Sequence, residues 1–455
     1  MKKALVILLS LAMIGVVFAE EPKPELKVSE FTGSASVLFG ADLDTGAVAF
    51  NNEASASLKV DIVSGGDKAT SGSGIWGELK IKTDGDPIRV TAKDTGAPTP
   101  SGKVVVDVAK LHFGDMAYLG IKKDGTAIDY AATPATAGRF FKVNDDKYYG
   151  IIRSDETLVR DVYGEVGPKA EYGVVFGVSL PKLFNLDVDF RSVENLVTDG
   201  SKVAAGYSNN KNAFGVRAKA ALTAVDNLTL EGAVNTGFDD NLGFGAKAEY
   251  KFALNDTYYL LPNVGFNGES CIADDEKFGW GAHAGLVFGW GAKSKIDYYF
   301  FDDSEYYPGV AAGITIKGDT DWPSTQKSPI GLNVSAMSGS IVPNLNAAVA
   351  FEVANLQATN LEMGIAAVAK YDVKMDPMTI TPKFGISYYS DASKATDDKA
   401  KTDIYVKAGL DIAKIFPNTT LSFEYASNDL NGGVKEGTST DKTMGLLYTK
   451  LKISF

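Results

Sequence analysis

The chain of 455 residues is too long for one ordinary compact core, so it forms either several soluble domains or one large repetitive architecture. The formal net charge of −12 argues against a nucleic-acid partner, because phosphate contacts need clustered Lys and Arg. A single cysteine, Cys271, excludes an internal disulfide, so an exported chain would need another source of stability. A closed hydrogen-bonded barrel would supply it.

The first residues have the features of an export signal. Two lysines precede the apolar residues 4–16, and Val17 and Ala19 place small residues before Glu20. We expect a signal peptide at 1–19 that is cleaved between Ala19 and Glu20; the alternative is an uncleaved membrane anchor. No later stretch approaches eighteen consecutive apolar residues, so the sequence predicts no transmembrane helix.

From Phe31 onward, apolar and polar residues alternate with a period of two, which is typical of strands with one apolar and one wet face. Several runs last about ten to thirteen residues, whereas strands of soluble proteins have about five or six and tilted bilayer-crossing strands about nine to eleven. The sequence therefore predicts an all-β fold, a large antiparallel transmembrane β-barrel with an even number of roughly sixteen to twenty strands and long outer loops. The clearest runs are 54–62, 214–222, 242–252, 361–373 and 404–412.

The alternation is weaker before about residue 170. We therefore expect two regions in the mature chain. Residues 20–169 form an N-terminal β-rich region, which is either the first part of the barrel or a separate periplasmic region. Residues 170–455 form the C-terminal β-barrel region.

Trp280 and Trp290 flank a run with one apolar face. At about 3.3 Å per residue they lie roughly 33 Å apart, and a tilt of about 40° projects this to roughly 25 Å, the height of the apolar band between two aromatic girdles. We expect these residues in the girdles of a barrel; a sandwich strand is the alternative. The opposite face carries mostly glycine and His283, which we interpret as a pore-lining residue.

Charged residues interleave on the polar faces and are almost absent from the apolar faces. The polar faces of a barrel meet the water of its lumen, so these residues are candidates for lining a pore and setting its selectivity. The pore-lining candidates are Arg217, Lys219, Lys247, Glu249, His283 and Lys407.

Two kinds of connection alternate along the chain. Short turns rich in Pro, Asn and Asp occur at 181–185, 224–227, 342–344 and 416–418. Longer polar segments include 194–211, 268–277, 390–401 and 428–442. Short periplasmic turns and long outer loops are typical of membrane barrels. When strands are counted from both ends of the chain, the two counts agree that all the short turns lie on the periplasmic side only under one condition. Residues 302–328 must form a single outer loop, and 310–316 must not be a strand that crosses the membrane.

The last thirteen residues resemble a closing strand. Leu451, Ile453 and Phe455 share an apolar face, and the chain ends on an aromatic residue, so we expect them to form the C-terminal assembly signal of an outer-membrane barrel. Thr449 interrupts this face.

No chemical site is predicted. The Asp-Thr-Gly motifs at 44–46 and 94–96 match aspartic proteases, but hairpin turns explain them better than a buried carboxylate dyad. His112 and His283 lie far apart, and the acidic residues at 302–305 lack the ligand spacing of a calcium loop. We expect no catalytic residues, no cofactor, no metal and no enzymatic activity.

The exported N-terminus and four further stretches resemble the treponemal major outer sheath protein family, which includes the repeat proteins of related pathogenic spirochaetes. The four stretches are 50–60, 76–82, 109–114 and the terminal strand. The resemblance implies an outer-membrane barrel, often oligomeric, with pore-forming activity and exposed loops that bind host matrix and cells. It also implies that a periplasmic N-terminal region is one possibility.

The resulting hypothesis is a porin-like barrel of the bacterial outer membrane through which small hydrophilic solutes diffuse. Expected partners are outer-membrane lipid, the barrel assembly machinery, the solutes, host matrix proteins and further copies of the chain. The alternative is a surface adhesin or structural outer sheath protein without a significant channel.

Overall fold

The fold is seen in a computed structural model. It describes residues 25–63, 75–91, 99–121, 172–192, 214–237, 241–271, 277–291, 294–295, 305–306, 308–319, 328–339, 341–353, 355–359, 361, 363–390, 402–427, 430 and 444–455.

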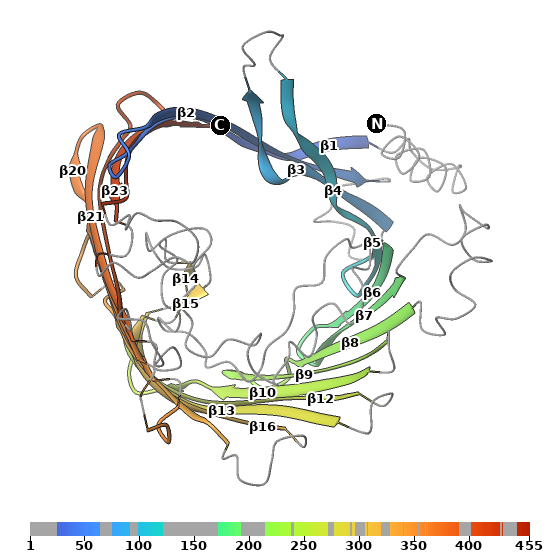
Figure 1. Cartoon of the computed structure of the whole chain (residues 1–455). Helices are drawn as coiled ribbons and strands as arrows, with labels where there is room; N and C mark the ends of the chain where they lie inside the picture. The colour runs from blue at the N-terminus through green and yellow to red at the C-terminus, as the bar shows by residue number, and fades with distance from the viewer. Residues whose placement is uncertain are drawn as a thin grey trace, which may run out of the picture.

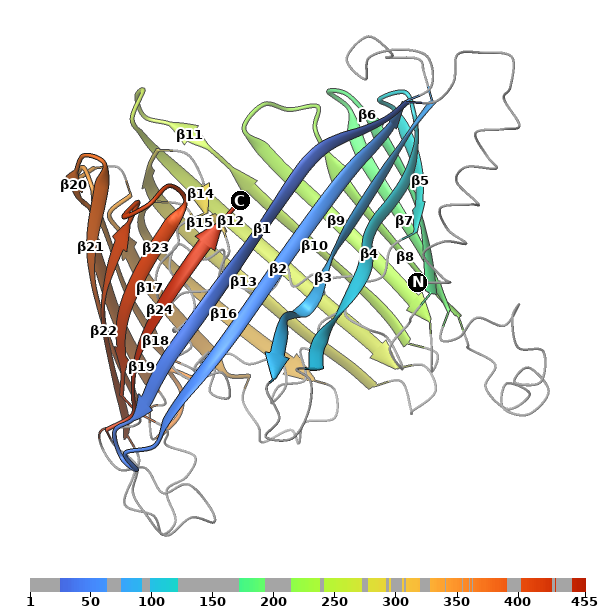
Figure 2. The ribbon, with the colours of Figure 1, turned by 90° about the horizontal axis from the view of Figure 1, so that it is seen from above.

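One antiparallel sheet runs through these residues and closes on itself, because β1 pairs with β2 on one side and with β24 on the other (Figures 1 and 2). The N-terminal strands are β1 (Glu25–Asp42), β2 (Val48–Val63), β3 (Ile75–Thr91), β4 (Thr99–Phe113) and β5 (Ala117–Ile121). The middle strands are β6 (Tyr172–Leu180), β7 (Phe184–Ser192), β8 (Phe214–Leu222), β9 (Leu228–Gly237), β10 (Asn241–Tyr250), β11 (Phe252–Ala253), β12 (Tyr258–Cys271), β13 (Lys277–Trp290) and β16 (Gly309–Asp319). The last strands are β17 (Ile330–Met337), β18 (Leu345–Val353), β19 (Met363–Tyr371), β20 (Val373–Met375), β21 (Met378–Ser390), β22 (Thr402–Ala413), β23 (Thr419–Ala426) and β24 (Leu446–Ser454).

The described sheet has 22 strands, of which β11 and β20 are short pieces beside the turns that follow β10 and β19. Without these two pieces the wall has 20 strands, an even number within the predicted range. The predicted fold class, an antiparallel transmembrane-type β-barrel, is therefore confirmed. Because every wall strand has two neighbours, the closed sheet leaves no edge strand to pair elsewhere.

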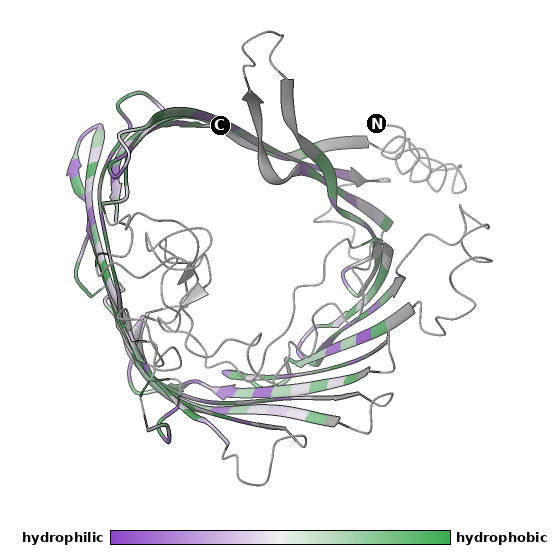
Figure 3. Ribbon diagram, in the orientation of Figure 1, coloured by the Kyte–Doolittle hydropathy of each residue, from purple (hydrophilic) through white to green (hydrophobic). Residues whose placement is uncertain are grey.

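Alternation along each strand separates two surfaces of the wall. On β12 and β13, Val264, Leu286 and Phe288 are exposed on the outer face, whereas Asn263 and Val287 are buried on the inner face. Figure 3 shows the corresponding alternation of hydropathy along β8 to β13. A barrel that spans a bilayer needs an apolar outer face toward lipid and a polar inner face toward water, and this wall has both.

The connections between strands lie at the two ends of the barrel, and we call these the tight-turn end and the loop end. The tight-turn end carries the turns after β4, β6, β8, β11, β17, β20 and β22, together with the start of β1 and the end of β24. Several of these turns contain a non-glycine residue with positive φ, such as Asn227 (64°), Asn344 (65°) and Asn418 (59°), and asparagine tolerates this conformation well. The opposite end, the loop end, carries the connections after β7, β21 and β23.

The interpretation of 310–316 as part of an outer excursion is wrong. These residues lie in β16, which pairs with β13 over eleven residues and with β17 over eight. The turns at 224–227 and 342–344 are separated by six wall strands, which are β9, β10, β12, β13, β16 and β17. Because this number is even when β16 is counted, both turns lie at the same end of the barrel. The connection between β13 and β16 leaves the tight-turn end instead. It carries β14 (Ser294–Lys295) and β15 (Glu305–Tyr306), which pair with each other.

The described strands before residue 122 belong to the same sheet, since β1 pairs with β24 and β5 pairs with β6. The signal peptide at 1–19, with its cleavage site at Ala19 and Glu20, lies outside the described residues. So do nearly all of the loops at 194–211, 390–401 and 428–442. In the part of the chain that is described, no helix is long and apolar enough to cross a membrane.

Candidate functional site: the inner wall

The inner wall of the barrel is the candidate site, because the strand register gathers the charged side chains there. All six pore-lining candidates fall on the inward register. Arg217 and Lys219 lie on β8, and Lys247 and Glu249 on β10. His283 on β13 and Lys407 on β22 take the same face. The candidates are spread around the wall and form no single cluster.

A ladder of ion pairs crosses β7 to β10. Arg217 on β8 pairs with Asp189 on β7. Glu231 on β9 lies between two lysines, with Lys219 Nζ at 3.2 Å from one carboxylate oxygen and Lys247 Nζ at 3.6 Å from the other. The partners stand side by side across adjacent strands, so each charge is offset by its neighbour, and water in the lumen meets both signs.

A second charged group lies on β2 to β4. Lys59 Nζ is 2.9 Å from Glu78 Oε1, and the other oxygen of Glu78 is 3.3 Å from His112 Nε2. The imidazole of His112 stacks on Trp76 with a centroid distance of 3.7 Å and an interplanar angle of 1°. Trp76 therefore turns an aromatic ring toward the lumen side, which breaks the simple apolar–polar alternation of β3.

Inward side chains tend to lie flat along the wall where the neighbouring strand offers a glycine. Tyr118 donates to Asp187 Oδ1 at 2.5 Å, and its ring lies so close over Gly177 that a Cβ there would clash with it. A Cβ at Gly285 would lie 2.7 Å from Asn263 Oδ1. Glycine thus allows bulky polar residues to lie along the wall, which leaves more of the lumen open.

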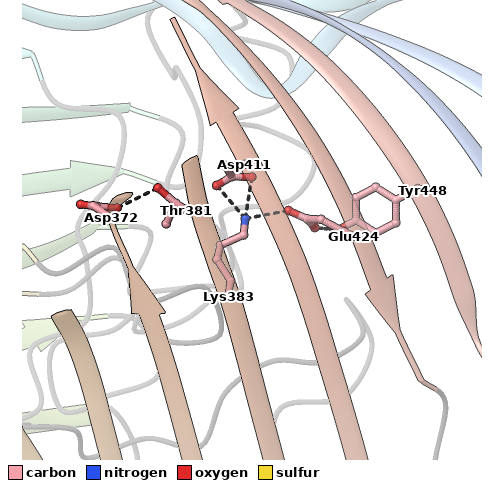
Figure 4. A network of polar contacts seen from close by, with 6 residues as sticks. All are labelled: Asp372, Thr381, Lys383, Asp411, Glu424 and Tyr448. Atoms are coloured by element: carbon pink, nitrogen blue, oxygen red, sulfur yellow. Dashed lines mark hydrogen bonds and ion pairs between the residues drawn. The ribbon is translucent and has the colours of Figure 1, made fainter. Parts of the chain in front are cut away.

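A third polar group occupies β21 to β24 and is drawn in Figure 4. Lys383 Nζ lies 2.8 Å from Asp411 Oδ2 and 3.0 Å from Glu424 Oε1, so it bridges two carboxylates on two following strands. Tyr448 on β24 donates a hydrogen bond to the other oxygen of Glu424. Four successive strands are therefore joined by one network on the inner face.

The wall between these groups is less charged. Its inward positions from β12 to β18 carry mainly Asn, Ser, Gly and Ala, and Asn333 donates to Glu352 Oε1 at 2.8 Å. The inward side chains described there, His283 included, are buried at nearly every position. Sequence reasoning placed His283 on the lumen face but gave no sign that it would be covered.

The two tryptophans expected in the girdles lie on the outward register at opposite ends of β13. Trp280 stands over Gly318 of β16, near the loop end. Trp290 lies at the tight-turn end, where its Nε1 donates to the carbonyl oxygen of Ser338 at 2.7 Å. Their assignment to girdles stays a prediction.

The C-terminal strand closes the barrel against β1. Leu451, Ile453 and Phe455 are exposed on the outer face. Phe455 exchanges two backbone hydrogen bonds with Gly33, of 2.7 and 3.0 Å, and its ring stacks on Phe31 at 5.7 Å.

At the other end of this seam, Asp44 accepts hydrogen bonds from the amides of Met444 and Gly445, both at 2.8 Å. The Asp-Thr-Gly motif at 44–46 is thus a turn that fastens the seam, and the motif at 94–96 lies outside the described residues.

Several of these residues could not be singled out from the sequence. The partners Asp189, Glu231 and Glu424 look like ordinary polar-face residues until strand pairing places them beside a cation. Within the described residues there is no group of three or more His, Cys, Asp or Glu side chains that could hold a metal ion.

Comparison with known proteins identifies relatives over the whole chain. No family model matches the sequence. The chain is 27% identical to the major outer membrane protein MspA of Treponema maltophilum, covering 100% of both chains. It is 26% identical to the major surface protein MspTL of Treponema lecithinolyticum, covering 98% of this chain and 96% of the other. Its curated homologues are treponemal major outer membrane and surface proteins. The family resemblance inferred from short stretches is thereby confirmed.

Solved structures to which the chain is similar include OpdL and the outer membrane protein OprD, both of Pseudomonas aeruginosa. OpdL is 10% identical and covers 93% of this chain and 97% of its own, with a TM-score of 0.40. OprD is 10% identical and covers 96% and 95%, with a TM-score of 0.39. The closed wall, its apolar outer face and its polar inner face agree with the names of the treponemal relatives. The chain is an outer-membrane β-barrel, as the sequence predicted.

Proposed function

We propose that the barrel is a diffusion channel for small hydrophilic solutes. The observation that carries this proposal is the closed 20-strand wall whose inner face holds the three charged groups described above. Such a face is costly in lipid and favourable against water, so it supports a hydrated lumen. No chemical step is involved, and selectivity would follow from the size of the lumen and the charges that line it.

The tight-turn end fits the periplasmic side. Membrane barrels have short periplasmic turns and longer outer loops, and the strand ends that flank 194–211, 390–401 and 428–442 all lie at the loop end. This orientation would expose the loop end at the cell surface, where those loops could bind host matrix proteins. Host binding, association with further copies of the chain and passage through the barrel assembly machinery belong to this proposal.

The test is a single-channel recording of the refolded full-length mature protein in planar bilayers. Discrete conductance steps are expected from protein that migrates as a folded barrel in an unheated gel. The same protein unfolded by boiling is the control and should give none. Folded, inserted protein without conductance would contradict the channel and favour a surface adhesin or structural sheath protein.

Host binding is tested separately by replacing each of the three loops with a short Gly/Ser linker. Binding to immobilised matrix proteins should fall while conductance persists. Unchanged binding in all three variants would refute a role for these loops.

A further inference from the structure

The charged side chains of the inner wall differ in how fully they meet the water of the lumen. Lys80 and Lys82 on β3 both pair with Asp107 on β4, with distances of 3.6 and 2.5 Å between the ammonium nitrogen and a carboxylate oxygen. The two lysine side chains are 37% and 41% exposed, whereas that of Asp107 is 23% exposed. The two ammonium groups are therefore more accessible than the carboxylate that they share.

The same arrangement occurs on β8 to β10. Lys219 and Lys247 are 36% and 31% exposed, and the side chain of Glu231, which lies between them, is 19% exposed. In both places two lysines from the inner face share one carboxylate, and in both places the carboxylate is the less accessible group. Water in the lumen meets both signs of charge, but it meets the ammonium groups more fully.

Side-chain length explains this order. A lysine carries its charge on a four-carbon stem, so its ammonium group reaches into water, while the carboxylate of Asp or Glu stays closer to the backbone. Two further ion pairs of the wall agree. Lys59 is 28% exposed against 15% for Glu78, and Lys450 is 31% exposed against 25% for Glu53.

The network on β21 to β23 reverses the order. Lys383 is 7% exposed, while Asp411 and Glu424 are 26% and 11% exposed. Here two carboxylates share one ammonium group, so the cation is the enclosed partner. Even so, the more exposed of these carboxylates is less exposed than each of the six lysines named above. Among these ion pairs, the most accessible charges on the lumen surface are therefore positive.

We infer that the channel prefers small anions, such as carboxylates, to small cations. The six lysines present ammonium groups on β2, β3, β8, β10 and β24, and fixed positive charge at a lumen surface raises the local concentration of anions. This preference rests on the proposed channel and names its solute class. It is opposite to what the net charge of −12 would suggest, because it depends on which charges are accessible in the lumen.

The first test is the reversal potential of the refolded full-length mature protein in a KCl gradient at neutral pH. Chloride should be at least about twice as permeant as potassium. Replacing Lys80 and Lys82 with Gln should lower this ratio, and so should the same change at Lys219 and Lys247. Lys374→Gln on the exposed strand β20 is the matched control and should leave the ratio unchanged. Potassium preference in the unaltered protein, or a ratio that neither double variant lowers, would overturn the inference.

A second test measures the charge of the wall without a current. Ser57 on β2 pairs with Lys82 of β3 in the strand register and is half-buried on the inner face. In a Cys271→Ser background, the Ser57→Cys thiol is treated with an anionic or a cationic methanethiosulfonate, which carry a sulfonate and a trimethylammonium group. The anionic-to-cationic ratio of modification rates should be at least about threefold higher than for free cysteine in solution. Both reagents consume the same thiolate, so a change in thiol ionisation cancels in this ratio.

The lysines are identified as the cause by adding Lys80→Gln and Lys82→Gln to the Ser57→Cys protein, which should return the rate ratio toward that of free cysteine. The unheated gel shift checks that each variant is folded. A rate ratio at or below that of free cysteine in a folded barrel would overturn the inference. A folded barrel that does not conduct but keeps the raised ratio would refute the proposed function and leave the positive lumen surface standing.

Discussion

Replacing Lys383 with Met should destabilise the barrel by about 3 kcal/mol at neutral pH. The ammonium group bridges Asp411 and Glu424, and the three side chains are 7%, 26% and 11% exposed. Removing one partner of a buried ion pair typically costs about 3–5 kcal/mol, because the remaining charge stays buried without compensation. The lower figure applies here since Asp411 is partly solvated and Tyr448 still donates to Glu424.

The loss of stability should be smaller when the carboxylates of Asp411 and Glu424 are removed together with Lys383. The triple variant Lys383→Met, Asp411→Asn, Glu424→Gln replaces the charged network with neutral groups of similar shape, so it should recover most of the lost stability. Lys374→Met on the exposed strand β20 is the matched control and should change stability by less than about 0.5 kcal/mol.

The assay is reversible unfolding by urea in lipid vesicles, followed by tryptophan fluorescence, with the unheated gel shift as a check that each variant folds. A change below about 1 kcal/mol for Lys383→Met, or a triple variant no more stable than the single one, would refute the view that this network holds β21 to β24 together.

Three further outcomes follow from the structure. Gly33→Val should reduce the folded, gel-shifted fraction severalfold, because a Cβ at Gly33 would lie 2.6 Å from the ring of Phe455, whereas Gly40→Ala, with its nearest contact at 3.6 Å, should fold normally; equal folding would contradict the seam packing. Asp44→Ala should cost about 1–2 kcal/mol by removing the acceptor of two backbone amides, and proteolysis near the seam should speed up accordingly; an unchanged cleavage rate would argue against it. Lys219→Glu combined with Lys247→Glu should shift the reversal potential in a KCl gradient toward cation preference, and no shift would place these side chains outside the ion path.

The sequence predicts the wall well where one face is purely apolar. Residues 242–252 and 280–290 alternate cleanly because all their outward positions carry apolar or aromatic residues. The early strands alternate less clearly since Trp76 and Tyr118 stand on the inner side and the pairing of β3 with β4 is shifted twice by irregularities. Counting strands from both ends wrongly predicts that 310–316 does not cross, although the alternation of Val310, Ile314 and Lys317 is that of a wall strand.

The inner wall shows a sharper limit. Alternation alone predicts an inward register for Lys219 and Lys247, but it does not predict that Glu231 lies between them, because this follows only from the register of β8, β9 and β10. His283 is buried, and the alternation around it in the sequence gives no sign of this burial. Ion pairing and burial of an inward side chain depend on the closed barrel as a whole, whereas the face to which a side chain points is set by its own strand.

The seam between β1 and β24 joins residues about 400 positions apart, as the hydrogen bonds from Met444 and Gly445 to Asp44 show. Every other strand pair in the wall can form between nearer segments, so this junction is the step with the longest loop to close. Until it forms, two bare sheet edges are available to pair with strands of another copy. Substitutions at this junction, such as Gly33→Val, would therefore lower the yield of folded barrel rather than the conductance of the finished channel.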